Sequence, residues 1–168
     1  DLTARNDWSS TLANTPAEKS GYFYWSAGLS AVISDMITLP SFMNYGKLRL
    51  TMAEVGNDVG IHSTIPTNTL STGVLTANVS GPYLGLPLRP ETSRSYAVGF
   101  EGRFWNNRVN FDLALYKTNT TDQYFSYEAA VGQIFTTAFL NAGNVQNKGI
   151  EAALGINAIQ KENFSWNT

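Results

Sequence analysis

The stretch Tyr96–Leu115, YAVGFEGRFWNNRVNFDLAL, decides the fold. At its centre, Asn106 and Asn107 tolerate the positive φ angles that a two-residue hairpin turn requires at both central positions. On either side of the turn, apolar and polar side chains alternate with the period of a half-buried strand. The stretch therefore predicts an antiparallel β-hairpin.

The turn also fixes which residues face each other across the predicted hairpin. The apolar face pairs Val98 with Leu115, Phe100 with Leu113, Gly102 with Phe111 and Phe104 with Val109. The opposite face pairs Glu101 with Asp112 and Arg103 with Asn110. We expect Phe111 to cover the bare backbone of Gly102, as aromatic rings do in sheets.

The same alternation recurs elsewhere in the chain, at 21–33, 46–55 and 147–157. Partial strands at about 1–8 and 163–168 bring the expected count to seven, of which two are partial. Between the strands, Ser34 or Asp35 is expected to cap one helical turn that ends before Pro40.

The composition favours a membrane protein. Charged residues make up only 14% of the chain and aromatic residues 12%, whereas soluble domains carry roughly 25% charged residues. No window approaches the ~18 consecutive apolar residues of a transmembrane helix. Strands cross a bilayer only as a closed barrel, so we expect an all-β, antiparallel transmembrane β-barrel segment in an outer membrane. Because the smallest barrels have about eight strands, this chain is expected to be part of a larger barrel.

The connections differ in length. Those at 106–107 and 158–162 are short, whereas about 57–92 and 119–144 are expected to be long loops. Outer-membrane barrels have short periplasmic turns and long extracellular loops. We therefore expect 57–92 and 119–144 to be extracellular.

Several classes of function are disfavoured. The net charge is −2 and no basic stripe is present, which argues against binding to nucleic acid. The chain has no cysteine, and its one histidine, His62, lacks partners for a metal site. No nucleophile elbow, phosphate-binding loop or zinc-protease motif occurs, so we expect no enzyme, cofactor or metal. Three N-glycosylation patterns, at Asn78, Asn119 and Asn163, are interpreted as chance.

Four strings of residues resemble a known family, the SusC/RagA-type TonB-linked outer-membrane transporters of Bacteroidetes. They are Leu2–Ser10 (LTARNDWSS), Lys47–Asn57 (KLRLTMAEVGN), Arg89–Thr92 (RPET) with Tyr96 and Gly99, and Asn141–Glu151 (NAGNVQNKGIE). The resemblance runs over nearly the whole of 1–168. It implies part of a larger, roughly 22-stranded barrel, with the plug domain and the remaining strands outside this chain. It also implies energy from TonB through the plug, a SusD-like surface lipoprotein as partner, and import of oligosaccharides or peptides.

The alternation and the resemblance together assign candidate roles. Extracellular ligand contacts are expected from Tyr124, Phe125 and Tyr127, since aromatic faces bury sugar or peptide surface; loop packing or an interfacial aromatic girdle is the alternative. The residues expected to line the lumen or face the plug are Tyr22, Tyr24, Arg49, Glu101, Arg103, Asp112 and Tyr116. The residues expected to face lipid are Phe23, Trp25, Leu29, Leu48, Leu50, Val98, Phe100, Phe104, Phe111, Leu113, Ile150 and Leu154.

Glu101 and Asp112 superficially resemble the carboxylate pair of a glycosidase, but we interpret them as lumen lining in which Arg103 offsets their repulsion. For the whole chain, the main alternative is a soluble β-sandwich glycan-binding module, in which the apolar faces pair with each other. A passive porin is a further alternative, and it predicts uptake that does not depend on energy.

Overall fold

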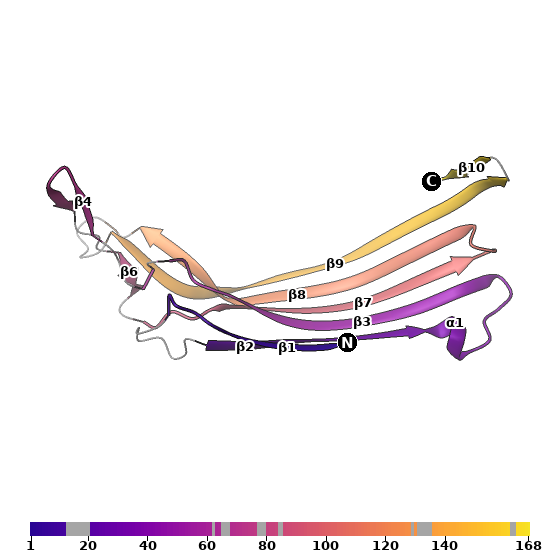
Figure 1. Cartoon of the computed structure of the whole chain (residues 1–168), viewed down its shortest axis with the longest axis horizontal. Coiled ribbons are helices and arrows are strands. Elements are labelled where there is room, and N and C mark those ends of the chain that lie inside the picture. The colour runs from indigo at the N-terminus through magenta and orange to yellow at the C-terminus, as the bar shows by residue number, and fades with distance from the viewer. Residues whose placement is uncertain are drawn as a thin grey trace.

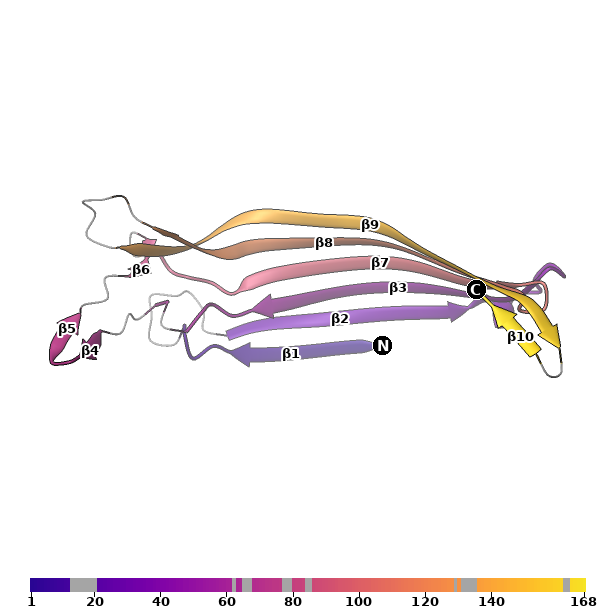
Figure 2. The same ribbon diagram turned by 90° about the horizontal axis from the view of Figure 1, so that it is seen from above.

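The computed structural model describes residues 1–12, 21–61, 63–64, 68–76, 80–83, 86–128, 130, 136–161 and 164–168. These residues form one curved layer of long antiparallel strands (Figures 1 and 2). Strand order in the sheet is β1-β2-β3-β7-β8-β9-β10, with β6 beside β9. The sheet is all-β and antiparallel, as the alternation predicts, and its strand order does not close on itself.

The main sheet is built from strands at these positions: β1 (Leu2–Trp8), β2 (Gly21–Val32), β3 (Met43–Asn57), β7 (Glu91–Phe104), β8 (Val109–Glu128), β9 (Thr137–Lys161) and β10 (Phe164–Asn167). A short strand, β6 (Gly81–Pro82), runs parallel to β9. Two more, β4 (Thr69–Ser71) and β5 (Val74–Thr76), form a separate hairpin. The seven expected strands are therefore the seven along the main path.

The hairpin of β7 and β8 has the predicted register. Val98 is the partner of Leu115 and Glu101 the partner of Asp112. Asn106 and Asn107 have φ angles of 55° and 62°, which are the left-handed values that the turn requires. Trp105 has a positive φ as well, and its N–H donates to the carbonyl of Phe42 at 2.8 Å.

Several boundaries expected from the sequence are wrong. The segment 119–144 is not one long loop, because β8 continues to Glu128 and β9 begins at Thr137. Likewise, β9 occupies most of the expected connection at 158–162, and β4, β5 and β6 lie within 57–92. Polar residues such as Asn119, Thr120 and Thr121 gave no apolar alternation, yet they continue the ladder because backbone groups do the pairing.

The helical turn expected at 34–40 is present as α1 (Ile33–Met36). The expected cap is wrong, because Val32 occupies the N-cap position and makes no side-chain hydrogen bond. Asp35 lies within the first turn instead. Helix α1 and the turn at 105–108 lie at one end of the sheet, called the turn end below (Figure 1). The opposite end carries β4, β5 and β6 and is called the loop end.

One face of the sheet carries a continuous apolar band. The register aligns Leu29, Leu50, Val98, Leu115 and Ile150 in one row across five strands. Along β7 the band runs from Phe104 to Tyr96, which matches the roughly 9–11 residues of a membrane-crossing strand. The band is uncovered, with Ile150 at 73% exposure and Leu29 at 65%.

This layer is not a β-sandwich, because no second sheet formed by the described residues lies against the apolar face. Among the described residues the buried apolar side chains are only Leu12, Val59, Leu88 and Ala138. In the same part of the chain, no helix is long and apolar enough to cross a membrane.

Gly102, within the apolar band, is covered differently from expectation. A side chain placed at Gly102 would meet the rings of Phe104 and Phe100 first, at 2.8 Å and 3.1 Å. These residues lie two positions away along the same strand, whereas Phe111 is the cross-strand partner. The rings of Phe100 and Phe104, on the same strand as Gly102, therefore cover the glycine more closely than its cross-strand partner Phe111 does.

Candidate functional site

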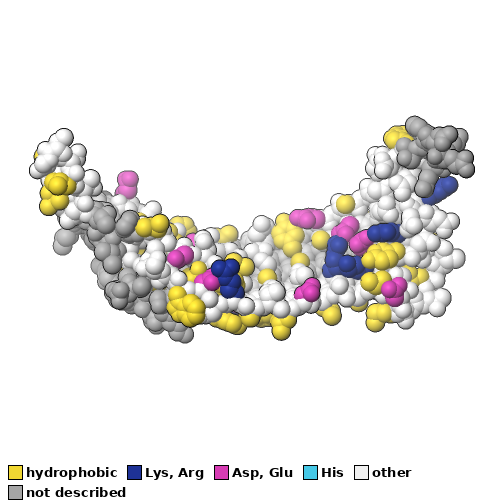
Figure 3. All heavy atoms as spheres, in the orientation of Figure 1, with side chains coloured by type: hydrophobic (Ala, Val, Ile, Leu, Met, Phe, Trp, Pro, Cys, Tyr) yellow, Lys and Arg dark blue, Asp and Glu magenta, His cyan; other side chains and the backbone are white. Residues whose placement is uncertain are grey.

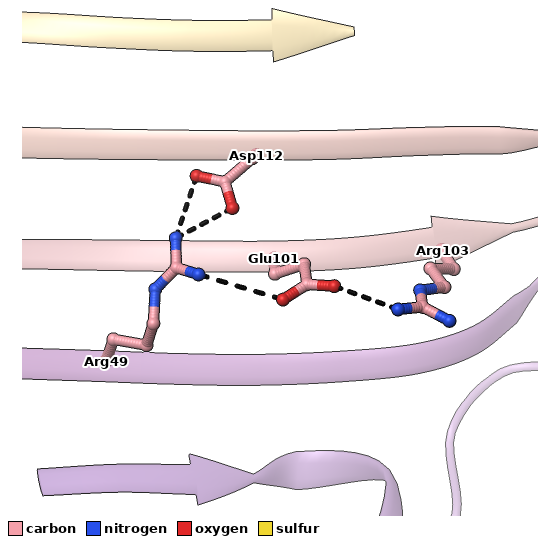
Figure 4. Close-up of polar contacts among 4 residues, drawn as sticks. All are labelled: Arg49, Glu101, Arg103 and Asp112. Atoms are coloured by element: carbon pink, nitrogen blue, oxygen red, sulfur yellow. Dashed lines mark hydrogen bonds and ion pairs between the residues drawn. The ribbon is translucent and has the colours of Figure 1, made fainter. Parts of the chain in front are cut away.

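The polar face carries a chain of ion pairs that joins three strands (Figure 4). Arg49 of β3 donates two hydrogen bonds to the carboxylate of Asp112 of β8, at 2.7 Å and 2.9 Å. Its other terminal nitrogen lies 3.7 Å from Glu101 of β7, and Glu101 in turn accepts from Arg103 at 3.2 Å. The four side chains are between 26% and 47% exposed, so water still reaches them.

Arg49 is therefore the main counter-charge of the two acids, and this differs from the sequence interpretation. Arg103 was expected to balance both carboxylates, but it contacts only Glu101. Its guanidinium also stacks over the Tyr45 ring, 4.8 Å from the centroid. Because both carboxylates are engaged by arginines, the arrangement fixes charge on the wall and does not resemble an acid/base pair that is free for catalysis.

Glycines on neighbouring strands let long polar side chains lie flat across the sheet. Gly99 is the register partner of Arg49, and a Cβ at Gly99 would lie 3.1 Å from the guanidinium Nε. Tyr116 lies over its partner Gly149 in the same way, with 2.6 Å between a Cβ there and the phenol oxygen. Arg49 reaches Asp112 two strands away because β7 has no side chain at Gly99.

Near the edge of the sheet that β1 forms, Tyr22 and Tyr24 of β2 stack on each other with ring centroids 5.9 Å apart. The Tyr24 hydroxyl donates to Asp7 of β1 at 2.6 Å, and Asp7 also accepts from Arg5 at 2.8 Å. The ring of Tyr22 fills the space where a side chain on Gly56 would stand. This second polar cluster binds β1 to β2 near the loop end.

Figure 3 shows where charge gathers on the polar face. Basic and acidic side chains lie side by side in the right-hand half of the view, and a second, smaller group of them lies left of centre. Apolar side chains protrude along the lower border. The seven residues expected on a lumen-facing surface thus fall into three groups on this face. Four form the ion-pair chain, Tyr22 and Tyr24 form the stacked pair, and Tyr116 lies over Gly149.

Tyr124 lies in β8, not in a loop as expected, and it packs inside the loop end. Its ring stacks on Phe139 with centroids 5.5 Å apart, against the buried cluster Leu12, Val59 and Leu88. Its hydroxyl shares a 2.6 Å hydrogen bond with Ser63. Burial raises the pKa of this phenol, and the hydrogen bond to Ser63 opposes the shift. Tyr124 therefore packs against both strand and loop residues of the loop end.

Phe125 and Tyr127 also lie in β8, and both are more accessible. Phe125 is 46% exposed and rests against Gly143, which has a φ of 86°. Tyr127 is 39% exposed and meets the Tyr83 ring edge-on at 5.7 Å. These two rings remain available for contact, whereas Tyr124 is committed to the loop-end core.

Hydrogen bonds between segments that are distant in the sequence hold the loop end together, and the sequence analysis did not predict them. The Asn141 side chain donates to the carbonyls of Arg89 and Asp122 and accepts from the N–H of Arg89, at 2.7–2.8 Å. Glu91 accepts from the N–H of Tyr124 at 2.6 Å and from Asn57 at 3.2 Å. The sequence did single out both segments, because Arg89–Thr92 and Asn141–Glu151 are two of the four strings that resemble the family. It did not indicate that these two segments hydrogen-bond to each other.

A further joint ties the end of β1 to the end of β3. Ser9 donates to the carboxylate of Asp58 at 2.7 Å, and Thr11 donates to the same group at 3.1 Å. No group of metal ligands occurs in the part of the chain that the structure describes. His62, Asn78 and Asn163 lie outside the described residues, and Asn119 lies within β8.

The comparisons with known proteins agree with this geometry. The family model described as TonB dependent receptor-like, beta-barrel, matches residues 1–168. The chain belongs to the TonB-dependent receptor β-barrel family. Members are outer-membrane receptors of Gram-negative bacteria, and the family is not one of enzymes. The resemblance found in the four strings is confirmed.

Individual relatives of this TonB-dependent receptor segment cover it almost completely. TonB-dependent receptor P26 of Formosa agariphila is 27% identical over 98% of the chain. Solved structures of the RagAB peptide importer in the open-open and closed-closed states share the fold, with TM-scores of 0.77 and 0.79 at 19% and 20% identity. The chain spans 17% of the length of the curated relative and 18% of each solved chain.

Proposed function

We propose that this chain is part of the wall of an outer-membrane active importer that takes up oligosaccharides or peptides through a plugged barrel, with energy supplied by TonB. The single observation that carries the proposal is the division of one sheet into two chemically different faces. One face is an apolar band of membrane width, and the other carries arginine–carboxylate pairs. Membership in the receptor family supports the same function.

In this proposal the apolar face contacts lipid. The twelve apolar residues assigned to it from the sequence share that face by register or alternation. A soluble protein seldom leaves an apolar patch of this extent uncovered. The lipid bilayer then supplies the burial that no second layer among the described residues provides.

The polar face then lines the lumen or faces the plug. Arginines paired with carboxylates hold their side chains in place, so the wall presents a fixed charge pattern to whatever fills the barrel. Tyr22, Tyr24 and Tyr116 lie flat on the same face, so they add hydrogen-bonding groups without narrowing the passage. Contact with a plug domain explains best why so many polar groups are fixed.

The loop end lies outside the cell in this proposal, since long connections characterise that side of outer-membrane barrels. Phe125 and Tyr127 are the ligand-contact candidates that remain accessible. Tyr124 acts indirectly, by holding the loop-end core together. A SusD-like lipoprotein is the proposed partner at this end, and the likeness to the RagAB importer supports a paired arrangement.

The function is tested by uptake in cells that carry the full-length protein. Labelled oligopeptides and oligosaccharides are supplied to a deletion strain, to the complemented strain and to the complemented strain without TonB. We expect uptake only in the complemented strain with TonB, and collapse of the proton gradient should abolish it. Uptake that persists without TonB would favour the passive porin and refute the proposal.

The orientation of the faces is tested separately by cysteine labelling, which the absence of native cysteine in this chain simplifies. Leu115→Cys places a thiol on the apolar face and Ala114→Cys places one on the polar face. In intact outer membrane, a lipid-soluble maleimide should label Leu115→Cys and a small water-soluble one Ala114→Cys. The reverse pattern would refute the orientation and leave the import assay untouched.

A further inference from the structure

The apolar band ends, on the loop-end side, in two lysines that face each other. Lys117 of β8 and Lys148 of β9 are register partners. Each lies two residues from a member of the band on its own strand, Leu115 or Ile150, so alternation places both ammonium groups on the apolar face. Both side chains are exposed.

The two charges are not compensated by the protein. Partners directly opposite in a sheet have Cβ atoms about 4.5–5.5 Å apart, and like charges there are destabilising. The acid nearest in the register on this face, Glu54, is taken by Arg94 at 2.7 Å. Among the described residues, neither lysine makes an ion pair or side-chain hydrogen bond. Among the described residues the pair thus presents two positive charges that an anion from outside the chain can bind.

The position of the pair indicates where that anion comes from. Lys117 has Tyr96 as its partner on the other side, and this tyrosine is 43% exposed at the border of the band. Tyrosines at such borders mark the level of lipid headgroups. Below the lysines, Leu115 and Ile150 are 45% and 73% exposed, which leaves a surface for acyl chains. A soluble anion would use the charges but not the apolar surface.

We propose that Lys117 and Lys148 bind the phosphate group of a lipid in the outer leaflet, whose acyl chains lie along Leu115 and Ile150. Each ammonium group donates hydrogen bonds to phosphate oxygens, and the negative charge of the phosphate offsets the repulsion between the two lysines. This inference rests on the orientation proposed above, with the apolar face in lipid and the loop end outside. It does not depend on which nutrient is imported.

The test uses the full-length protein purified from outer membranes in mild detergent. Phosphorylated lipid that remains bound is counted by mass spectrometry for the parent and for Lys117→Gln, Lys148→Gln and the double variant. Retention should fall about fivefold for each lysine and roughly thirtyfold for both. Lys47→Gln is the matched control, because Lys47 lies on the polar face opposite Glu101. Unchanged retention in the double variant would overturn the proposal.

A second measurement guards against misfolding and separates lipid from free anion. Lys117→Glu replaces the like-charge pair with an attractive one, so it should fold and resist heat at least as well as the parent in pure detergent. In phosphatidylcholine vesicles, added phosphatidic acid should raise the melting temperature of the parent but not of Lys117→Glu. An equal rise with inorganic phosphate alone would refute a lipid site. Failure of the labelling test above would refute the orientation and the lipid site together, whereas failure of the import assay alone would leave the lipid site standing.

Discussion

At the scale of single residues, the polar face depends on how far one side chain reaches. Arg49 contacts Asp112 across an intervening strand, and it does so over Gly99. Alternation placed Arg49, Glu101 and Asp112 on one face, so the members of the network were predictable. The pairing was not, because it depends on β3 lying beside β7, two strands that residues 58–90 separate in the sequence.

Replacement of Arg49 by methionine should lower the free energy of unfolding by about 1 kcal/mol, the range of exposed ion-pair networks. Glu101 and Asp112 then repel each other without a counter-charge between them. Urea unfolding of the full-length protein in detergent measures the change. Lys47→Met serves as control, since this lysine faces Glu101 without a hydrogen bond; an equal loss in both variants would contradict the role of Arg49.

Replacement of Gly99 by valine should remove the coupling between Arg49 and Asp112, because the new side chain occupies the space where the guanidinium crosses β7. A double-mutant cycle with Arg49→Met and Asp112→Asn measures that coupling. We expect it to fall from several tenths of a kcal/mol to near zero. Ala97→Val, on the same face of β7, should leave it intact.

Tyr124 gives a pH-dependent prediction. Burial raises the pKa of the phenol in the folded state, so folding favours the neutral form. Stability is therefore retained below the unfolded value near pH 10 and is lost as the pH rises through the higher folded value. Limited proteolysis of intact cells should show loop-end cleavage increasing above about pH 10. Tyr124→Phe should show a smaller increase, with the remainder due to Tyr127, whose pKa burial also raises. The same pH dependence in Tyr124→Phe would contradict the assignment.

At the scale of elements, the turn and the register of the hairpin of β7 and β8 were predictable because their information is local. Two asparagines specify the turn, and the turn specifies every partner along both strands. The lengths of β8 and β9 were not predictable from alternation. Beyond Leu115 the side chains are polar on both faces, and only the neighbouring strand shows that the ladder continues.

The turn supplies a prediction of its own. Asn107 has a φ of 62°, a conformation that costs a β-branched residue roughly 1–2 kcal/mol. Asn107→Val should therefore lower stability by about that amount, whereas Asn107→Gly should be neutral or slightly stabilising. Thermal unfolding in detergent compares the two. Equal destabilisation by glycine would show that the asparagine side chain, and not the backbone angle, matters.

At the scale of the whole molecule, the described residues form one main layer, and none of them covers its apolar band. A layer of this kind is stable only when neighbouring strands close it and lipid covers it. The fold is therefore a part of a larger barrel, which agrees with the 18% of the solved importer chains that it spans.

Expression of the 168-residue chain alone provides the corresponding test. In buffer without detergent it should aggregate, because Phe23, Leu29 and Ile150 are 60–73% exposed on one face. Analytical ultracentrifugation measures the outcome, and substitution of these three residues by threonine should raise the soluble fraction. A monodisperse soluble monomer of the parent would contradict the membrane-facing role of the band.

The sequence by itself determined the alternation of apolar and polar residues in the strands, the face on which the alternating side chains lie, and the hairpin at Asn106 and Asn107. A two-residue period and a turn are local properties. It also determined the family, through four strings, of which Arg89–Thr92 and Asn141–Glu151 are hydrogen-bonded to each other near the loop end. Only the tertiary structure decided that Arg49 reaches Asp112, that Tyr124 packs inward and that Lys117 faces Lys148. Each of these contacts joins different strands, and the order and register of strands that long connections separate depend on the sheet as a whole.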